Sequence, residues 1–256
     1  MLILGDVRSQ PDKLEKFIKY KPKTNHLILG NIINSFAKRE DIIKCFELVL
    51  ESQILVLYGG NDISYRLYPP YDIKDFRVDI SSTIRNIINR CEDRWQCAWG
   101  DDTYIATSAG IHPRIATFKS PREQAKLLNF VLKESIERHN HTDEIFNKKR
   151  ENGDPFPGPM WLNYITDNLS NKWSQIFGHI PTGIDIITND IKDKPHICLD
   201  MKDDDQWICF NTQTHMFEDL KTGNIIDIIG VCNEENKICS NKNPETFKKY
   251  CQSDLA

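Results

Sequence analysis

Polar side chains able to bind a cation follow three short apolar runs in the first quarter of the sequence. Each run leads through glycine to a carboxylate or an amide, and these end positions are Asp6, Asn31, Asn61 and Asp62. Such an ending is typical of a buried strand whose carboxyl end carries a functional side chain. The carboxyl ends of parallel strands meet at one edge of a sheet. The pattern therefore predicts one polar site, with oxygen ligands of the kind that divalent cations take.

Two helices are predicted between these strands. Residues 12–18 place Leu14, Phe17 and Ile18 on one helical face, and residues 39–52 carry apolar side chains at the same helical spacing. Parallel strands need crossover connections of this kind. We therefore expect the first three strands and two helices to form a βαβαβ unit of a layered α/β fold.

The composition bears on several classes of protein. The 256 residues carry a net charge of −4 with scattered lysine and arginine, so nucleic-acid binding is unsupported. No apolar stretch approaches the roughly 20 residues that span a bilayer, and we expect no membrane association. The eight cysteines lack zinc-type spacing, and no signal peptide precedes them. We therefore expect reduced thiols and a cytoplasmic protein.

Two later segments repeat the pattern of a strand that leads into a polar turn. Residues 103–113 are predicted to form a strand that ends near Ser108. Residues 175–181 do the same, and the turn contains His179. An imidazole near the other polar ends adds a nitrogen ligand to the oxygen ligands.

The last part of the sequence is predicted to hold a hairpin and an extension. The acidic run that begins at Asp200 is expected to be a solvated turn between strands at 197–199 and 207–210. Beyond residue 220, a β-like segment at 225–231 is expected to wrap back on its own domain or to dock on a partner.

In this order, the polar turns resemble the motifs of the calcineurin-like metallophosphoesterases, especially the phage and bacterial serine/threonine protein phosphatase and dinucleoside-tetraphosphatase branch. The resemblance covers residues 1–218. It implies an α/β (α+β layered) fold in which two β-sheets form a sandwich flanked by helices. We therefore expect a degenerate phosphoesterase domain at 1–220 and a C-terminal extension at 221–256. The resemblance also implies two metal ions that activate a water and hold a phosphate.

Several positions depart from the metal-binding pattern of that family. Asp6, Asn61 and His179 match it, whereas Arg8, Asn31 and Ser108 stand where the resemblance places metal ligands. These last three are therefore lost-ligand positions. Two divalent ions about 3.5 Å apart repel by roughly 19 kcal/mol at an effective dielectric constant of about 20, and Asn31 replaces the bridging carboxylate that offsets this repulsion. A binuclear centre is not expected.

The catalytic and phosphate-binding positions also differ. Asp62 stands in place of the general-acid histidine and Ser35 in place of a phosphate-binding arginine, so we treat both as vestigial positions. Asn163 stands where a second phosphate-binding arginine is common in the phosphatase branch. No catalytic residue is assigned.

Arg8 is expected to substitute for the charge of a metal ion and to pair with Asp6. One outcome is a cleft that binds a phosphate-bearing ligand through Arg8, and the other is a salt bridge that holds the former site shut. A third possibility is a single site for Mn, Fe, Zn or Mg. The residues that would hold this ion are Asp6, Asn61, Asp62 and His179.

The main hypothesis is a pseudo-phosphatase that keeps the fold, lacks a cofactor and acts as a binding or scaffold protein for a protein partner. It is supported by losses at several independent catalytic positions in one chain. The alternative is a single-metal phosphatase or nucleotidase, a metal-dependent phosphoric ester hydrolase acting on a phosphoprotein or a nucleotide. Tight, stoichiometric divalent metal would distinguish the alternative.

Overall fold

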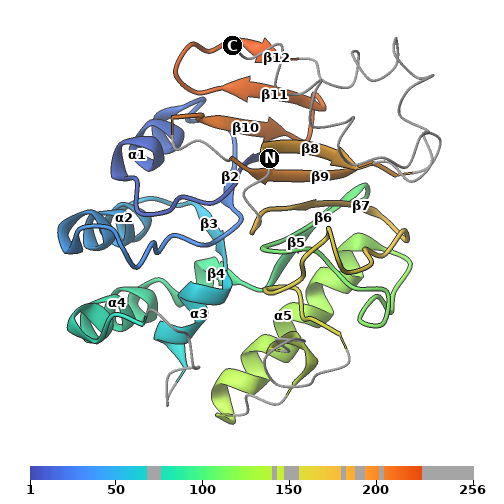
Figure 1. The fold of residues 1–256 in the computed structure, drawn as a ribbon, viewed down its shortest axis with the longest axis horizontal. Coiled ribbons are helices and arrows are strands. Elements are labelled where there is room, and N and C mark those ends of the chain that lie inside the picture. The colour runs from blue at the N-terminus through green and yellow to red at the C-terminus, as the bar shows by residue number, and fades with distance from the viewer. Residues whose placement is uncertain are drawn as a thin grey trace.

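Two β-sheets face each other, and helices cover their outer surfaces (Figure 1). The computed structural model describes residues 1–67, 76–139, 143–146, 156–179, 183–187, 194–201 and 205–226. The prediction of two sheets flanked by helices is confirmed.

The first sheet has seven strands in the order β12-β11-β10-β1-β2-β3-β4. β1, β2, β3 and β4 are parallel to one another, whereas β10 is antiparallel to β1, β11 to β10 and β12 to β11. Its strands are β1 (Leu2–Leu4), β2 (His26–Ile28), β3 (Leu55–Leu57), β4 (Trp95–Gln96), β10 (Ile208–Asn211), β11 (Met216–Asp219) and β12 (Ile225–Ile226). The predicted parallel arrangement of the first three strands is confirmed.

The second sheet has five strands in the order β5-β6-β7-β9-β8. β6, β7 and β9 are parallel, so the carboxyl ends of β7 and β9 lie at the same edge. Its strands are β5 (Ala98–Gly100), β6 (Tyr104–Thr107), β7 (Ser174–Phe177), β8 (Gly183–Ile187) and β9 (His196–Asp200).

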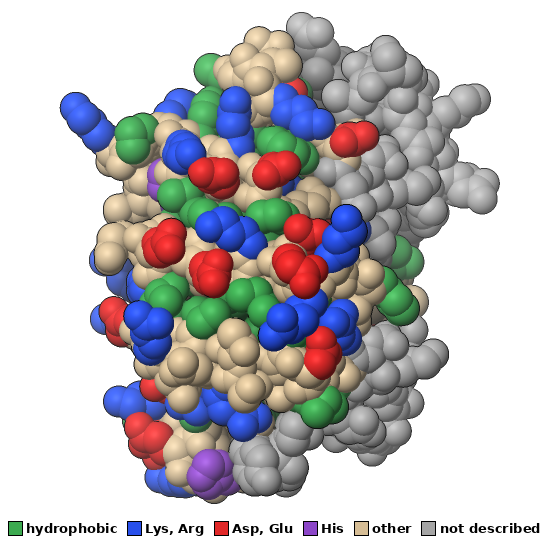
Figure 2. Space-filling view, turned by 90° about the vertical axis from the view of Figure 1, so that its left-hand side faces the viewer, with side chains coloured by type: hydrophobic (Ala, Val, Ile, Leu, Met, Phe, Trp, Pro, Cys, Tyr) green, Lys and Arg blue, Asp and Glu red, His purple; other side chains and the backbone are tan. Residues whose placement is uncertain are grey.

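The helices bury their apolar faces on the two sheets. α1 and α2 connect β1 to β2 and β2 to β3, and they lie with α4 on the outer face of the first sheet, whereas α5 covers β5 and β6 (Figure 1). The helices are α1 (Pro11–Lys19), α2 (Arg39–Glu51), α3 (Gly60–Arg66), α4 (Val78–Arg90) and α5 (Pro121–Glu137), with short 3-10 turns at η1 (Glu92–Arg94) and η2 (Glu144–Phe146). On the helical side of the first sheet, acidic and basic side chains are interspersed (Figure 2).

The side chains of β1 point alternately to the two faces of the sheet, and this explains how the two layers are joined. Leu2 and Leu4 belong to the larger apolar cluster, which lies under the helices. Ile3 points the other way, into a second cluster that contains Ile176 of β7 and Leu199 of β9. Since successive side chains of a strand point to opposite faces, one three-residue strand contributes to both cores.

The predicted hairpin between residues 197–199 and 207–210 is wrong. β9 belongs to the five-stranded sheet and β10 to the seven-stranded sheet, so the chain crosses from one sheet to the other between them. The sequence showed two short strands around polar residues, which is the pattern of a hairpin, and gave no sign that each strand had a different neighbour.

The β-like segment predicted after residue 220 is described only at its beginning. β12 pairs with β11, through Phe217↔Ile226 and Glu218↔Ile225, and therefore extends the sheet past residue 220. The rest of that segment, and the expected extension to residue 256, lie outside the described residues. Within the described part of the chain, no helix combines the length and apolarity needed to cross a membrane.

Candidate functional site

Two of the polar strand ends meet beyond the carboxyl edge of the first sheet. Asp6 follows β1 and Asn31 follows β2, and the Nδ2 of Asn31 donates a hydrogen bond of 2.9 Å to the Oδ2 of Asp6. Both side chains are buried. Asn31 thus presents an N–H donor to Asp6, where the resemblance implied a carboxylate that bridges two metal ions.

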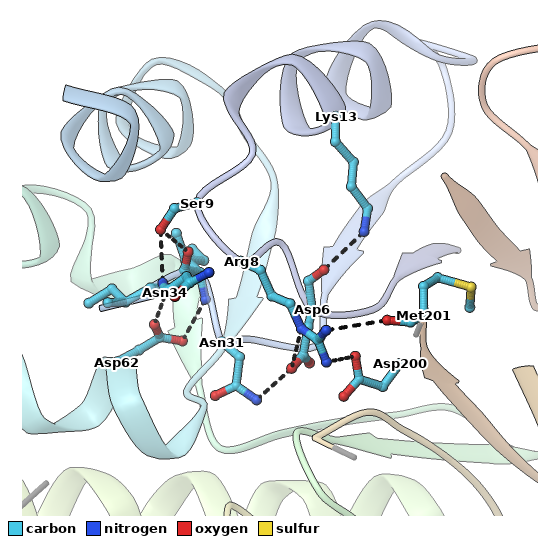
Figure 3. Close-up of polar contacts among 11 residues, drawn as sticks. Asp6, Arg8, Ser9, Lys13, Asn31, Asn34, Asp62, Asp200 and Met201 are labelled. Atoms are coloured by element: carbon cyan, nitrogen blue, oxygen red, sulfur yellow. Dashed lines mark hydrogen bonds and ion pairs between the residues drawn. The ribbon is translucent and has the colours of Figure 1, made fainter. Parts of the chain in front are cut away.

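Arg8 places its guanidinium between two carboxylates (Figure 3). Its Nη2 donates to the Oδ1 of Asp200 at 2.5 Å, and its Nε lies 3.9 Å from the Oδ2 of Asp6. A third contact runs from Nη1 to the carbonyl oxygen of Met201 at 3.3 Å. The side chain of Arg8 is 24% exposed, whereas that of Asp200 is 1% exposed. The geometry therefore includes the expected pairing of Arg8 with Asp6, and adds a shorter pairing with Asp200.

The prediction that Asp200 lies in a solvated turn is wrong. Asp200 is the last residue of β9 and is fully buried. A usable signal was present, because the apolar run at residues 197–199 leads directly to an aspartate, much as β1 leads through a glycine to Asp6. The neighbouring acidic residues gave the segment the appearance of a surface turn instead. Two of them, Asp203 and Asp204, lie outside the described residues.

Asp6 lies in an environment that disfavours its charge. Burial raises its pKa well above the ordinary value, and the nearby carboxylate of Asp200 raises it further. The guanidinium of Arg8 and the amide of Asn31 act in the opposite direction. The Oδ1 of Asp6 has no hydrogen-bond partner within the described structure, and a Cβ added to Gly178 would lie 2.7 Å from it.

Both carboxylate oxygens of Asp62 accept hydrogen bonds from backbone N–H groups. It accepts N–H groups from Ile32 at 3.3 Å, from Ile33 at 3.2 Å and from Gly59 at 3.2 Å. Burial raises the pKa of Asp62 to about 7, although these N–H donors favour the charged form. Asp62 therefore fastens the loop after β2 to the start of α3, apart from the pair formed by Arg8 and Asp200 (Figure 3).

His179 and Ser108 lie on the side of the site formed by the second sheet. The Gly178 N–H, next to His179, donates to the carbonyl oxygen of Ser108 at 2.8 Å. Burial, together with the nearby positive charge of Arg8, lowers the pKa of His179 to about 4, so the imidazole is neutral at pH 7. The Oγ of Ser108 is buried and has no hydrogen-bond partner among the described residues.

Trp161 closes this side of the site and was not predicted to belong to it. Its ring lies edge-on to His179, with 6.1 Å between ring centroids. A Cβ added to Gly60 would come within 2.5 Å of the same ring. The glycine at the start of α3 therefore makes room for the indole. The sequence placed Trp161 near a candidate position but held no signal of its contact with α3.

The remaining candidates have local roles or stand apart. The side-chain oxygen of Asn163 accepts the N–H of Ile165 at 3.1 Å, which forms a turn. The carbonyl oxygen of Ser35 accepts from Nη1 of Arg77 at 3.2 Å. Asn61 is half-buried in the first turn of α3.

The donor set does not fit a binuclear metal centre. The Oδ2 of Asp6 faces N–H groups of Arg8 and Asn31, and these donors compete with a cation for the same lone pairs. Asp62 has committed both oxygens to backbone. In the part of the chain that the structure describes, three or more His, Cys, Asp or Glu side chains are nowhere arranged as a metal-binding group.

The fold is similar to that of solved phosphatases. A cold-active protein tyrosine phosphatase of a psychrophilic Shewanella species superposes with a TM-score of 0.59 over 88% of this chain and 78% of its own, at 12% identity. A further structure of a cold-active protein tyrosine phosphatase gives a TM-score of 0.58 over 88% and 77% of the two chains, also at 12% identity. At this identity the likeness shows the fold alone: this chain shares the two-sheet fold of these phosphatases.

A metallophosphoesterase from Sphaerobacter thermophilus gives a TM-score of only 0.37 at 10% identity over 97% of this chain and 96% of its own, which is too weak to support an argument. No protein-family model matches the sequence, and no curated protein is significantly similar to it. The likenesses therefore establish the fold, and the function is inferred from the site.

Proposed function

We propose that this chain is a pseudo-phosphatase, a metallophosphoesterase-fold protein that binds a protein partner in the cytoplasm instead of hydrolysing a phosphoester. One observation carries the proposal: the guanidinium of Arg8 lies between Asp6 and Asp200, so the chain supplies a positive charge at the candidate metal position. Hydrolysis by this class of site needs metal ions that activate a water and hold the phosphate. A fixed guanidinium brings charge and hydrogen-bond donors but does not activate water.

The neighbouring residues support the same proposal. Asn31 directs an N–H group toward Asp6, and Ser108 offers a hydroxyl in place of a stronger ligand. Asp62 is bound to backbone and does not offer a free acid to a leaving group. The positions in question come from several different loops. Their joint loss is more consistent with a site that has given up hydrolysis than with one altered ligand.

The test compares metal content with turnover. The purified chain is dialysed, its metal is measured by elemental analysis, and p-nitrophenyl phosphate hydrolysis is followed with added Mn²⁺. We expect less than about a tenth of an equivalent of metal and no turnover above buffer. About one equivalent of metal, with turnover that His179→Ala abolishes, would overturn the proposal in favour of the single-metal hydrolase.

A back-substituted variant makes a negative result informative. The triple variant Arg8→His, Asn31→Asp and Ser108→His returns the ligand types that the resemblance implies. We expect it to retain Mn²⁺ after dialysis where the unaltered chain does not. The matched control is Arg90→His, an added imidazole at an exposed position of α4. Equal Mn²⁺ retention in the control and the triple variant would show non-specific binding.

A further inference from the structure

The contacts of Arg8 join the two sheets at a place where their backbones lie close together. Asp6 follows β1 of the seven-stranded sheet, and Asp200 ends β9 of the five-stranded sheet. A Cβ added to Gly5 would lie 1.7 Å from the carbonyl oxygen of Leu199, so only a glycine fits there. The guanidinium thus lies directly beside a backbone contact between the layers.

The surroundings of the guanidinium have the composition of a cation site. Two carboxylates and the carbonyl oxygen of Met201 contact it, and these are oxygen ligands that hard cations prefer. Asp6 is only 5% exposed, yet its Oδ1 has no hydrogen-bond partner in the described structure. That oxygen is therefore a buried acceptor to which no described group donates a hydrogen bond.

We infer that Asp6, Asp200 and the Met201 carbonyl form an inter-sheet cation site, that Arg8 is its resident cation, and that removing Arg8 makes the site available to a divalent metal ion. This ligand set differs from the one expected from sequence because it includes Asp200. The inference goes beyond the proposed function, since it concerns how the two sheets are joined. It holds or fails without reference to any partner.

Charge balance is the physical basis of the inference. With Arg8 present, one guanidinium lies beside two buried acidic side chains, 2.5 Å from Asp200 and 3.9 Å from Asp6. Removing it takes away the cation that both buried side chains share, which is unfavourable. A divalent cation restores the balance and accepts the same oxygens. An arginine that served only as a surface salt bridge would leave no such vacancy for a metal to fill.

The experiment measures thermal unfolding of the full chain with and without MnCl₂ at matched ionic strength. We expect Arg8→Ala to lower the Tm by about 5 °C. Saturating Mn²⁺ is expected to return about 3 °C or more of this loss, because it binds the folded state alone. Calorimetric titration of the same variant is expected to show one Mn²⁺ site.

Two controls separate this site from general effects of manganese. The unaltered chain is expected to show no Tm shift with Mn²⁺, since its guanidinium fills the site. The double variant Arg8→Ala, Asp200→Asn is expected to show none either, because it lacks the second carboxylate. Arg8→Lys retains the charge and is expected to lose less stability than Arg8→Ala, without a response to Mn²⁺.

An unchanged Tm of Arg8→Ala in Mn²⁺ would overturn the inference, as would an equal rise in the double variant. If Arg8→Ala does not fold, Arg8→Gln takes its place, since it removes the charge and retains more of the side-chain volume. A Mn²⁺ response of the unaltered chain would count against the resident role of Arg8. The proposed function is tested by different measurements, the metal content and the turnover of the unaltered chain, so the two can fail independently.

Discussion

Asp62 illustrates how a single carboxylate in this fold serves the backbone. Its two oxygens hold three N–H groups that belong to the loop after β2 and to the residue before α3. Its complete burial has a cost that depends on pH, because the protonated form needs less solvation than the carboxylate. The residue therefore couples the position of a loop to a titration.

Replacing Asp62 with asparagine is expected to change the pH dependence of stability. The folded-state pKa is about 7 and the ordinary value is 3.8, so the folded chain retains a proton that the unfolded chain releases. This contribution to the free energy of unfolding is full below pH 3.8 and is lost as the pH rises toward about 7. Asp62→Asn does not titrate there. Urea unfolding at several pH values between these limits measures the difference.

The control for this experiment is Asp102→Asn, because the side chain of Asp102 is 88% exposed. Its stability curve should run parallel to that of the unaltered chain. If the curve of Asp62→Asn is also parallel to that of the unaltered chain across the same range, then Asp62 does not carry the raised pKa.

Sequence patterns predicted part of the site because its polar side chains follow closely after strands. Glycine followed by a polar residue after an apolar run correctly indicated that Asp6 and Asn31 converge. Asp200 was assigned to solvent because the residues after it are acidic, although an apolar run leads directly to it. The contact between Trp161 and Gly60 depends on packing between segments about 100 residues apart, for which one sequence holds no signal.

At the scale of elements, α2 ends without a basic residue in its last turn and is completed from outside. Arg94, in the 3-10 turn before β4, donates to the carbonyl oxygens of Val49, Leu50 and Ser52. These groups lie at the C-terminus of the helix, where backbone carbonyls lack intrahelical partners and attract positive charge. One side chain thus ties the end of α2 to the strand at the edge of the first sheet.

Arg94→Ala is expected to lower the free energy of unfolding by about 2 kcal/mol, because it removes several hydrogen bonds from a charged donor. Urea denaturation followed by circular dichroism measures the change. Arg90→Ala, at an exposed position of α4, is the matched control and should change stability by less than about 0.5 kcal/mol. Equal effects of the two variants would contradict the capping role of Arg94.

Gly5 gives a prediction about the contact between the sheets. A methyl group there would overlap the carbonyl oxygen of Leu199, which is backbone and has little freedom to move. Gly5→Ala is expected to destabilise the fold by about 3 kcal/mol, the upper part of the range for overpacking. Chemical denaturation checks this, with Ser82→Ala at an exposed position of α4 as the control. A loss below about 1 kcal/mol would show that the layers separate easily.

At the scale of the whole molecule, the layered architecture follows from local patterns more directly than its connections do. Apolar runs and helical spacing correctly predicted a parallel unit at the N-terminus, and the family resemblance implied the two sheets flanked by helices. The assignment of β9 and β10 to different sheets did not follow, because their short sequences fit equally well in a hairpin. Partner choice is decided by the assembled core, where β9 lies beside β7 and β10 beside β1.

The whole fold is expected to be stable without metal. Since the guanidinium of Arg8 links Asp6 to Asp200, EDTA should leave the Tm of the unaltered chain within about 1 °C of its value in buffer. Differential scanning calorimetry with a salt control of equal ionic strength measures this. A marked fall in Tm with EDTA, reversed by added Mn²⁺, would show that a bound metal contributes to folding.

The register of β1 has a consequence for synthesis of the protein. Leu2 pairs with Asn211, so one hydrogen-bonding edge of β1 has no partner until almost all described strands have left the ribosome. At translation rates of about 5–20 residues per second, this interval lasts roughly 10–40 s. During it the nascent chain carries an open apolar strand, a form prone to edge-to-edge association. Chaperones that bind nascent chains would have to shield this strand, because its partner β10 lies near the end of the described sequence.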